Sequence, residues 1–197
     1  MRFHRVFKLP EVALTLIAAA CHSAARRTPP TIAHPTPTVA PTPEVLELDQ
    51  GERRVRRGSR DSTGVFILKV DGQNGGSPDL VMGYENVVPG RTIMPHRHLV
   101  ADEIIFVHEG SGVAEVGELK KPFGPGATIY IPKNVRVSVH NTGPVPLAIA
   151  FFFSKPGFEA YMRDTSVPEG QPVPPMSREE LAAIRARHRW HVAYEQP

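Results

Sequence analysis

Eight short segments rich in β-branched and aromatic residues follow one another between Val65 and Phe153, and each is bounded by Gly, Pro, Asn or Asp. Turn sequences such as Val88-Pro89-Gly90 and Glu109-Gly110-Ser111-Gly112 join several of them. This pattern predicts an all-β fold, a single jelly-roll β-barrel whose interior can receive a small ligand. The expected strands are 65–70, 80–87, 92–98, 103–108, 112–116, 127–131, 135–141 and 147–153.

The segment from Gly90 to Gly110 places two histidines and a carboxylate at spacings that suit a metal site. Side chains alternate faces along a strand, so His96 and His98 project from the same face. Glu103 follows five residues later and can reach them from the next strand. Two imidazoles and one carboxylate form the facial triad of non-haem iron sites and also suit manganese, nickel or zinc. The alternative is a pair of surface histidines that share no ligand.

The flanking glycines extend this pattern into a longer motif. The spacing reads Gly, five residues, His, one residue, His, four residues, Glu, six residues, Gly. It resembles the first conserved motif of the cupin superfamily, with every keyed position filled. The resemblance covers about residues 65–153 and implies a single-domain, type-2-like cupin barrel with a divalent metal ion as cofactor.

A second cupin motif follows after a hairpin, and its match is partial. Gly126, Pro132 and Asn141 fall on the motif's positions. Asn134 stands where the family usually has glycine, a mild change because Asn tolerates positive φ. Val137 stands where the family usually has its last metal-binding histidine. The resemblance therefore implies three protein ligands where four are usual.

Strand alternation predicts which neighbouring polar side chains stay outside the site. The face that carries Val137 is apolar and should point inward, so His140 should point outward. By the same alternation Asp102 and His108 face away from Glu103. The interior near the metal is expected to be largely apolar, formed by Met94, Ile105, Val107, Val137 and Val139.

Three ligands have two opposite consequences for function. Open coordination positions are what a catalytic metal needs, which favours a metal-dependent dioxygenase or isomerase acting on a small organic substrate. A missing ligand also weakens metal affinity, which favours a non-enzymatic small-molecule binding or sensing module of the cell envelope. Fold alone does not decide between these hypotheses. The cupin resemblance also suggests a homodimer.

The N-terminus resembles a bacterial lipoprotein signal over residues 1–21. Basic residues precede a short apolar stretch, which ends in Ala18-Ala19-Ala20-Cys21 as a permissive lipobox. Cys21 is the single cysteine of the chain, and lipidation at Cys21 would explain it. The alternative is that Cys21 lies within a signal removed at another site. We expect an exported, lipid-anchored protein on the periplasmic or surface side of a bacterial cell envelope.

Composition indicates how the rest of the chain is organised. Residues 22–43 are expected to form a disordered linker, rich in Pro and Thr, and residues 44–154 the barrel. The net charge is only +3, and basic and aromatic residues do not interleave, so we expect no nucleic-acid partner. The basic segment from Arg53 to Arg60 is interpreted as a solvated lead-in to the first strand.

A helical extension is expected over residues 155–197. Residues 156–165 form a first short helix, with an apolar face for packing on the barrel. A proline-rich turn follows, and Ser177-Arg-Glu-Glu180 is a capping box that starts a second helix, which ends near His188. The stripe that contains Ile184 and His188 is interpreted as a packing face, and His188 and His191 are not expected to bind metal.

Overall fold

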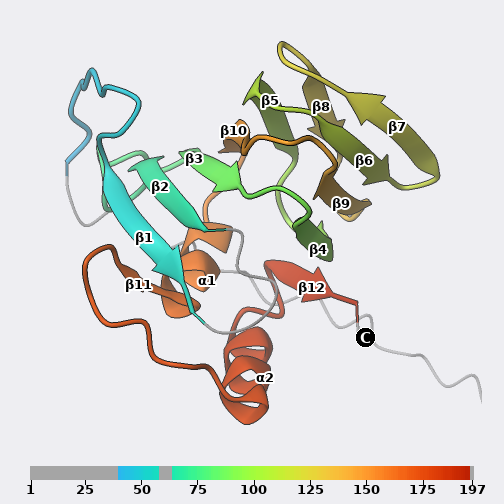
Figure 1. Cartoon of the computed structure of the whole chain (residues 1–197). Coiled ribbons are helices and arrows are strands. Elements are labelled where there is room, and N and C mark those ends of the chain that lie inside the picture. Colours follow the sequence, from blue (N-terminus) through green and yellow to red (C-terminus); the bar gives the residue numbers. More distant parts are fainter. Residues whose placement is uncertain (1–39, 58–63, 196–197) are drawn as a thin grey trace, which may run out of the picture. The chain divides into compact units, whose positions relative to one another are not determined.

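The computed structural model describes residues 40–57 and 64–195. The signal-like segment 1–21 with Cys21, residues 22–39 of the linker and residues 58–60 of the basic segment lie outside this described part. Within it, no helix is both long and apolar enough to cross a membrane. All described elements belong to one compact unit (Figure 1).

Two antiparallel sheets form the barrel. The larger sheet has the strand order β11-β1-β2-β3-β10-β5-β8, and the smaller has the order β12-β4-β9-β6-β7. Segments of alternating apolar residues fold as strands because one face of each is buried. The larger sheet contains β1 (Glu52–Arg56), β2 (Val65–Val70), β3 (Val81–Val87), β5 (Glu103–Glu109), β8 (Thr128–Ile131), β10 (Leu147–Phe153) and β11 (Ser166–Pro168).

The smaller sheet contains β4 (Thr92–His98), β6 (Gly112–Val116), β7 (Leu119–Phe123), β9 (Arg136–Asn141) and β12 (Val192–Tyr194). Two short helices, α1 (Phe158–Asp164) and α2 (Arg178–Arg187), follow the barrel strands. The expected all-β jelly roll with a short helical C-terminal extension is therefore confirmed. Strand β7 was not among the strands expected from the sequence.

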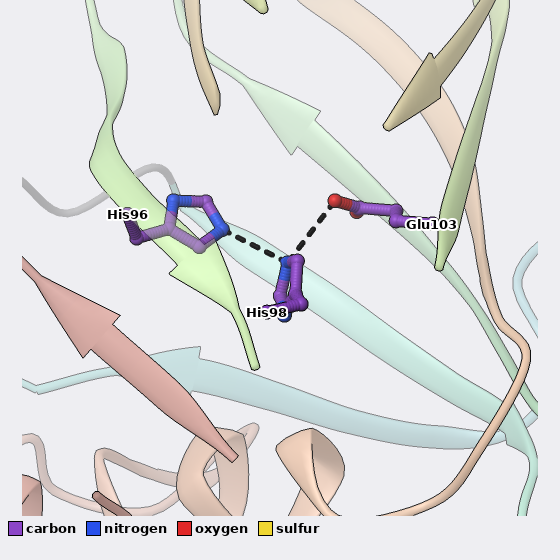
Figure 2. Close-up of side chains that lie close together, drawn as sticks. All are labelled: His96, His98 and Glu103. Atoms are coloured by element: carbon purple, nitrogen blue, oxygen red, sulfur yellow. Dashed lines mark hydrogen bonds and ion pairs between the residues drawn. The ribbon is translucent and has the colours of Figure 1, made fainter. Parts of the chain in front are cut away.

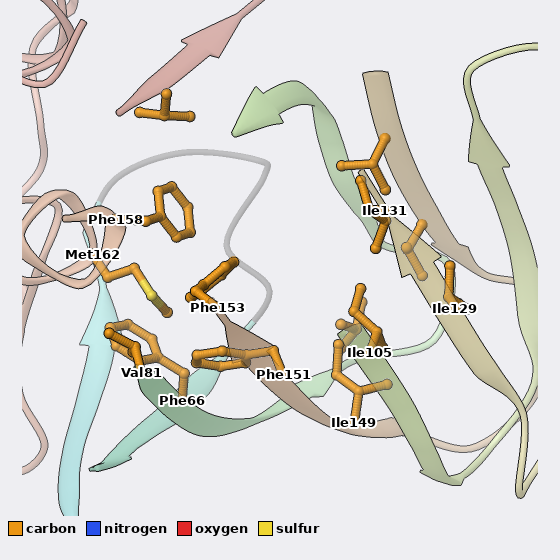
Figure 3. Packing of buried hydrophobic residues seen from close by; sticks show 14 of the residues in the cluster. Phe66, Val81, Ile105, Ile129, Ile131, Ile149, Phe151, Phe153, Phe158 and Met162 are labelled. Carbon is orange, nitrogen blue, oxygen red and sulfur yellow. The ribbon is translucent and has the colours of Figure 1, made fainter. Parts of the chain in front are cut away.

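The core lies between the two sheets. Strand β5 shows how alternation fills it: Ile105 and Val107 are buried, whereas Ile104 and Phe106, which alternate with them, are exposed on the outer face. Helix α1 adds apolar side chains at the open end of the barrel, where Phe158 and Met162 reach the strand side chains (Figure 3). Other core members are Phe66, Val81, Ile129, Ile131, Ile149, Phe151 and Phe153.

Strand β4 carries a bulge just before the two histidines. Ile93 pairs with Val139 on β9, but His96 pairs with Val137, so two residues of β4 oppose a single residue of β9. One of the two is Pro95, which has no N–H for the ladder. The bulge therefore lies on β4, and the alternation of β9 is undisturbed.

Residues 53–56 of the basic segment belong to β1, so the interpretation of these residues as a solvated lead-in was wrong. Arg53, Arg56 and Arg57 pair with carboxylates from distant parts of the chain, whereas Arg54 pairs with the nearby Glu52. Arg53 pairs with Glu169, and Arg57 with Glu180 on α2. Because these partners are far away in the sequence, the local sequence of the segment shows its positive charge but does not predict the ion pairs.

The C-terminal extension contributes a strand to each sheet. Strand β11 pairs with β1, and β12 pairs with β4, opposite the two histidines. The capping box of α2 is confirmed, because the Ser177 side chain accepts a hydrogen bond from the Glu180 backbone N–H at 3.0 Å. Ile184 and His188 are buried, as expected for a packing face. The extension is thus built into the barrel wall.

Candidate metal centre

Three ligand-type side chains converge at one end of the barrel interior. His96 Nε2 lies 3.0 Å from His98 Nε2, and His98 Nε2 lies 3.1 Å from Glu103 Oε2 (Figure 2). One potential ligand atom from each residue lies within 4.8 Å of the other two. The two histidines come from β4 and Glu103 from the start of β5, as the strand spacing predicted. No other such group occurs in the described part of the chain.

All three groups are nearly removed from solvent. His96, His98 and Glu103 keep only 4%, 1% and 6% of their surface exposed. Polar groups are costly to bury unless they have partners, so three together in an apolar interior call for a compensating interaction. The alternative of two surface histidines is excluded by this burial.

His96 is held in the form that can bind a metal. Its Nδ1 lies 2.7 Å from the Met94 carbonyl oxygen, in the bulge of β4, so Nδ1–H donates and Nε2 keeps its lone pair. Burial, with the neighbouring His98 as a second cause, lowers the pKa of His96 to about 4. At neutral pH the imidazole is therefore uncharged, and its Nε2 points toward His98.

Two buried atoms of the group have no hydrogen-bond partner within the described chain. They are His98 Nδ1 and Glu103 Oε2. The Oε2 atom lies near His98 Nε2, but the contact is not a hydrogen bond. Ligands about 2.1 Å from one tetrahedral ion are separated by roughly 3.4 Å, close to the separations seen here. The donor set and its unsatisfied oxygen therefore fit a divalent metal ion.

The group has three members within the described part of the chain, and the position where the cupin resemblance implies a fourth ligand is Val137. Val137 is fully buried beside His96 and offers no donor atom. His140 lies on the other face of β9, where its Nδ1 is 2.8 Å from Thr92 Oγ1. His108 is exposed, and Asp102 accepts a hydrogen bond from the Lys133 N–H in a loop. The predicted outward positions of these three side chains are confirmed.

A cavity of about 160 Å³ adjoins the candidate metal centre. Most of the strand side chains that line it are apolar, and Met94, Ile105, Val137 and Val139 are among them as predicted, whereas Val107 is not. Its other wall comes from the C-terminal extension and from β1, which sequence reasoning left out of the site. These added lining residues include Arg56, Phe158, Tyr161, Arg185 and Tyr194.

Aromatic rings of the extension pack directly on the histidines. Tyr194 stacks on His96 with ring centroids 5.4 Å apart, and Phe158 stands edge-on to His98 at 4.6 Å. Burial, together with the adjacent Tyr161 phenol, raises the pKa of Tyr194 well above its usual value. Tyr194 therefore remains a hydrogen-bond donor. In the sequence, the one indication that the C-terminal extension lines the cavity is the spacing of the aromatic residues in 158–162.

The histidines of the extension do not belong to the metal centre. His188 Nε2 lies 2.8 Å from Asp164 Oδ2, and its ring packs edge-on against Tyr161. His191 packs against Gly157, where a side-chain carbon would come within 2.1 Å of its Nδ1. Neither joins the three-residue group, as expected.

Comparison with known proteins agrees with this architecture. Residues 83–153 match the family described as Cupin domain. Dimethylsulfoniopropionate lyase DddW from Ruegeria pomeroyi is 31% identical over 93 residues, which is 46% of this chain and 59% of that protein. Protein SchB from Streptomyces halstedii is 33% identical over 70 residues, which is 36% of this chain and 51% of that protein. The chain thus spans little more than half the length of the curated relatives it matches.

A solved structure shares the fold. It is described as a predicted oxalate decarboxylase from Thermotoga maritima, and it superposes with a TM-score of 0.50 at 16% identity, over 57% of this chain and 100% of that chain. The family match and this superposition support a cupin barrel in this chain, with the C-terminal extension added to it.

Proposed function

We propose that this barrel binds one divalent metal ion through His96, His98 and Glu103 and acts as a metal-dependent enzyme on a small organic substrate. The single observation that carries the proposal is the convergence of three buried donors, with an unsatisfied carboxylate oxygen, at the wall of a cavity. Fe, Mn, Ni and Zn all suit this donor set. We propose a dioxygenase or isomerase reaction. A lyase reaction is a further possibility, because one relative is named as a lyase.

A metal bound here would act as a Lewis acid or activate dioxygen. The chain's own residues would position the substrate and hold protons. Apolar side chains, Ile105 and Val139 among them, exclude water from one side of the cavity. The Tyr194 phenol, kept protonated by its raised pKa, is a donor for a substrate oxygen beside His96.

Metal analysis of the purified full chain tests the proposal. We expect close to one divalent ion per chain in the wild type and loss of that ion in His96→Ala and Glu103→Ala. His108→Ala is the matched control, because His108 lies on the same strand as Glu103 but faces solvent. Equal metal content in all four proteins would contradict the proposed site. Turnover of any substrate should stop when a chelator removes the ion.

The second candidate function is a non-enzymatic binding module of the cell envelope. Val137 in place of a fourth ligand, and a largely apolar cavity, favour it. Metal-free protein that binds its small-molecule ligand as tightly as the loaded protein would support it against the enzyme. A turnover abolished by chelation would exclude it.

Export and lipid anchoring remain proposals that rest on residues 1–21. We propose that Cys21 is acylated and tethers the protein to a bacterial membrane. Labelling with a fatty-acid analogue should mark the wild type and not Cys21→Ser. Labelling of both proteins, or of neither, would contradict lipidation at this residue.

A further inference from the structure

Among the described residues that line the cavity, one arginine has no carboxylate partner within the described part of the chain. The charged lining side chains are Arg56, Arg57, Glu85, Glu103 and Arg185. Arg56 binds Glu85 through two N–H groups, at 3.2 and 3.0 Å. Arg57 binds Glu180 in the same way, at 2.6 and 2.9 Å.

Arg185 differs from these two arginines. In the described part of the chain it makes no ion pair, and its Nε is buried without a hydrogen-bond partner. Burial of an unpaired guanidinium nitrogen is costly, and the five donors of an arginine are normally used. This unsatisfied donor indicates a partner from outside the chain.

The position of Arg185 relates it to the metal centre. It lies on α2, and its guanidinium carbon is 4.6 Å from the centre of the Tyr194 ring. That same ring stacks on His96. A guanidinium over an aromatic ring is attracted to the ring face, which helps to hold the side chain in position. One aromatic residue thus contacts both the free cation and a metal ligand.

We propose that the substrate or ligand of this cavity is a small carboxylic acid whose carboxylate is bound by Arg185, while the rest of the molecule extends along the apolar wall toward His96. This deepens the proposed function and rests on it, since the same cavity would receive the substrate. A single guanidinium matches the charge and planarity of one carboxylate. A phosphate dianion would need more positive charge than Arg185, the one unpaired arginine among the described lining residues, supplies. The cavity of about 160 Å³ is below the roughly 300–1,000 Å³ of drug-sized sites.

The test uses matched probes that differ only in charge. Linear carboxylates of three to six carbons are titrated into the metal-loaded full chain, next to the corresponding primary amides and inorganic phosphate, with ligand-observed NMR as the readout. We expect the acids to bind at least about tenfold more tightly than the amides, the usual scale of a charged hydrogen bond. We expect Arg185→Gln to abolish this preference and Arg185→Lys to restore part of it.

Arg189→Gln is the matched control, because it removes the same charge from an exposed position. Thermal unfolding of each variant establishes that it folds. Equal binding of acids and amides by the wild type, an acid preference retained in Arg185→Gln, tighter binding of phosphate, or no binding of any acid would each overturn the inference. Because a metal ion can also hold a carboxylate, the titration is repeated after chelation. An Arg185-dependent acid preference without metal supports the inference even where metal analysis contradicts the proposed enzyme.

Discussion

Val137 lies directly across from His96 in the pairing of β9 with β4. Directly opposed residues of an antiparallel pair project to the same face, and both of these side chains are buried and line the cavity. The position at which the cupin resemblance expects a histidine is therefore next to a proposed metal ligand.

Val137→His should add a fourth ligand to the centre. We expect divalent metal to bind at least about tenfold more tightly, equivalent to about 1.4 kcal/mol, as measured by competition with a chromophoric chelator. The larger side chain should destabilise the metal-free protein by about 1–3 kcal/mol through overpacking. Val139→His is the control, because Val139 is equally buried but pairs with Ile93. A similar gain in metal affinity in both variants would refute the role of position 137.

Local pattern predicted the part of the site that strand alternation controls. His96, His98 and Glu103 lie where their two-residue periodicity and motif spacing placed them, and His140 points away. Alternation along β9 correctly predicted which of its side chains point inward, because the bulge lies in β4 and not in β9. Asn134 has φ 62°, in agreement with its interpretation at a glycine position.

The remainder of the site depends on pairings between distant segments. Strand β12 has three residues, too few for a periodicity, and it forms only because β4 presents an edge to it. Strand β7 lies at the edge of its sheet and contains lysines and a proline. Such residues discourage pairing with another chain at a sheet edge, and they also interrupt the apolar alternation by which a strand is predicted. Tyr194 lines the cavity because β12 pairs with β4, and Arg185 lines it from α2. Neither position could be predicted from the local sequence.

The aromatic wall should matter for metal binding. Tyr194→Ala removes the ring that packs on His96, so water gains access and the imidazole loses its support. We expect roughly a tenfold loss of metal affinity, the lower range for groups that support a ligand. Tyr194→Phe keeps the ring and should stay within about twofold of the wild type. Unchanged affinity in Tyr194→Ala would show that the wall does not support the centre.

Arg163 joins the extension to the barrel through buried charges. Its Nη2 atom donates a hydrogen bond of 2.6 Å to Asp71 Oδ2, and the guanidinium also binds Glu52 on β1. Asp71 is fully buried, so Arg163→Ala should leave an uncompensated charge and lower the free energy of unfolding by about 3–5 kcal/mol. Arg187→Ala is the comparison, since its pair with Asp164 is largely exposed and should contribute no more than about 1 kcal/mol. Equal losses in urea denaturation would count against this distinction.

We propose that an exposed apolar row on the outer face of the larger sheet forms the interface of the homodimer that the cupin resemblance suggests. Ile104 pairs with Tyr130 on β8 and with Phe152 on β10, and Phe106 follows on the same face, all four exposed. A second copy covering this row would remove apolar surface from water. Phe106→Glu should then yield a monomer in light scattering, whereas Leu119→Glu, on the edge strand β7 of the smaller sheet, should not. The same mass for wild type and Phe106→Glu would contradict this dimer.

Glu159 should make stability depend on pH in the direction opposite to an ordinary ion-paired carboxylate. Burial raises the pKa of Glu159, although its Oε2 accepts a hydrogen bond of 2.6 Å from the Gly157 N–H. A folded pKa above the unfolded one favours the folded state at low pH, and that contribution is lost as the pH rises through the folded pKa. Glu159→Gln keeps a hydrogen-bond acceptor without the charge. At pH 7.5 its free energy of unfolding, measured by urea denaturation, should exceed that of the wild type by on the order of 1 kcal/mol. The advantage should shrink toward pH 5, whereas Glu118→Gln, in an exposed turn, should show no such trend. A Glu159→Gln variant that is less stable than wild type at pH 7.5 would mean that the carboxylate is stabilised by the nearby Arg163 more than burial penalises it.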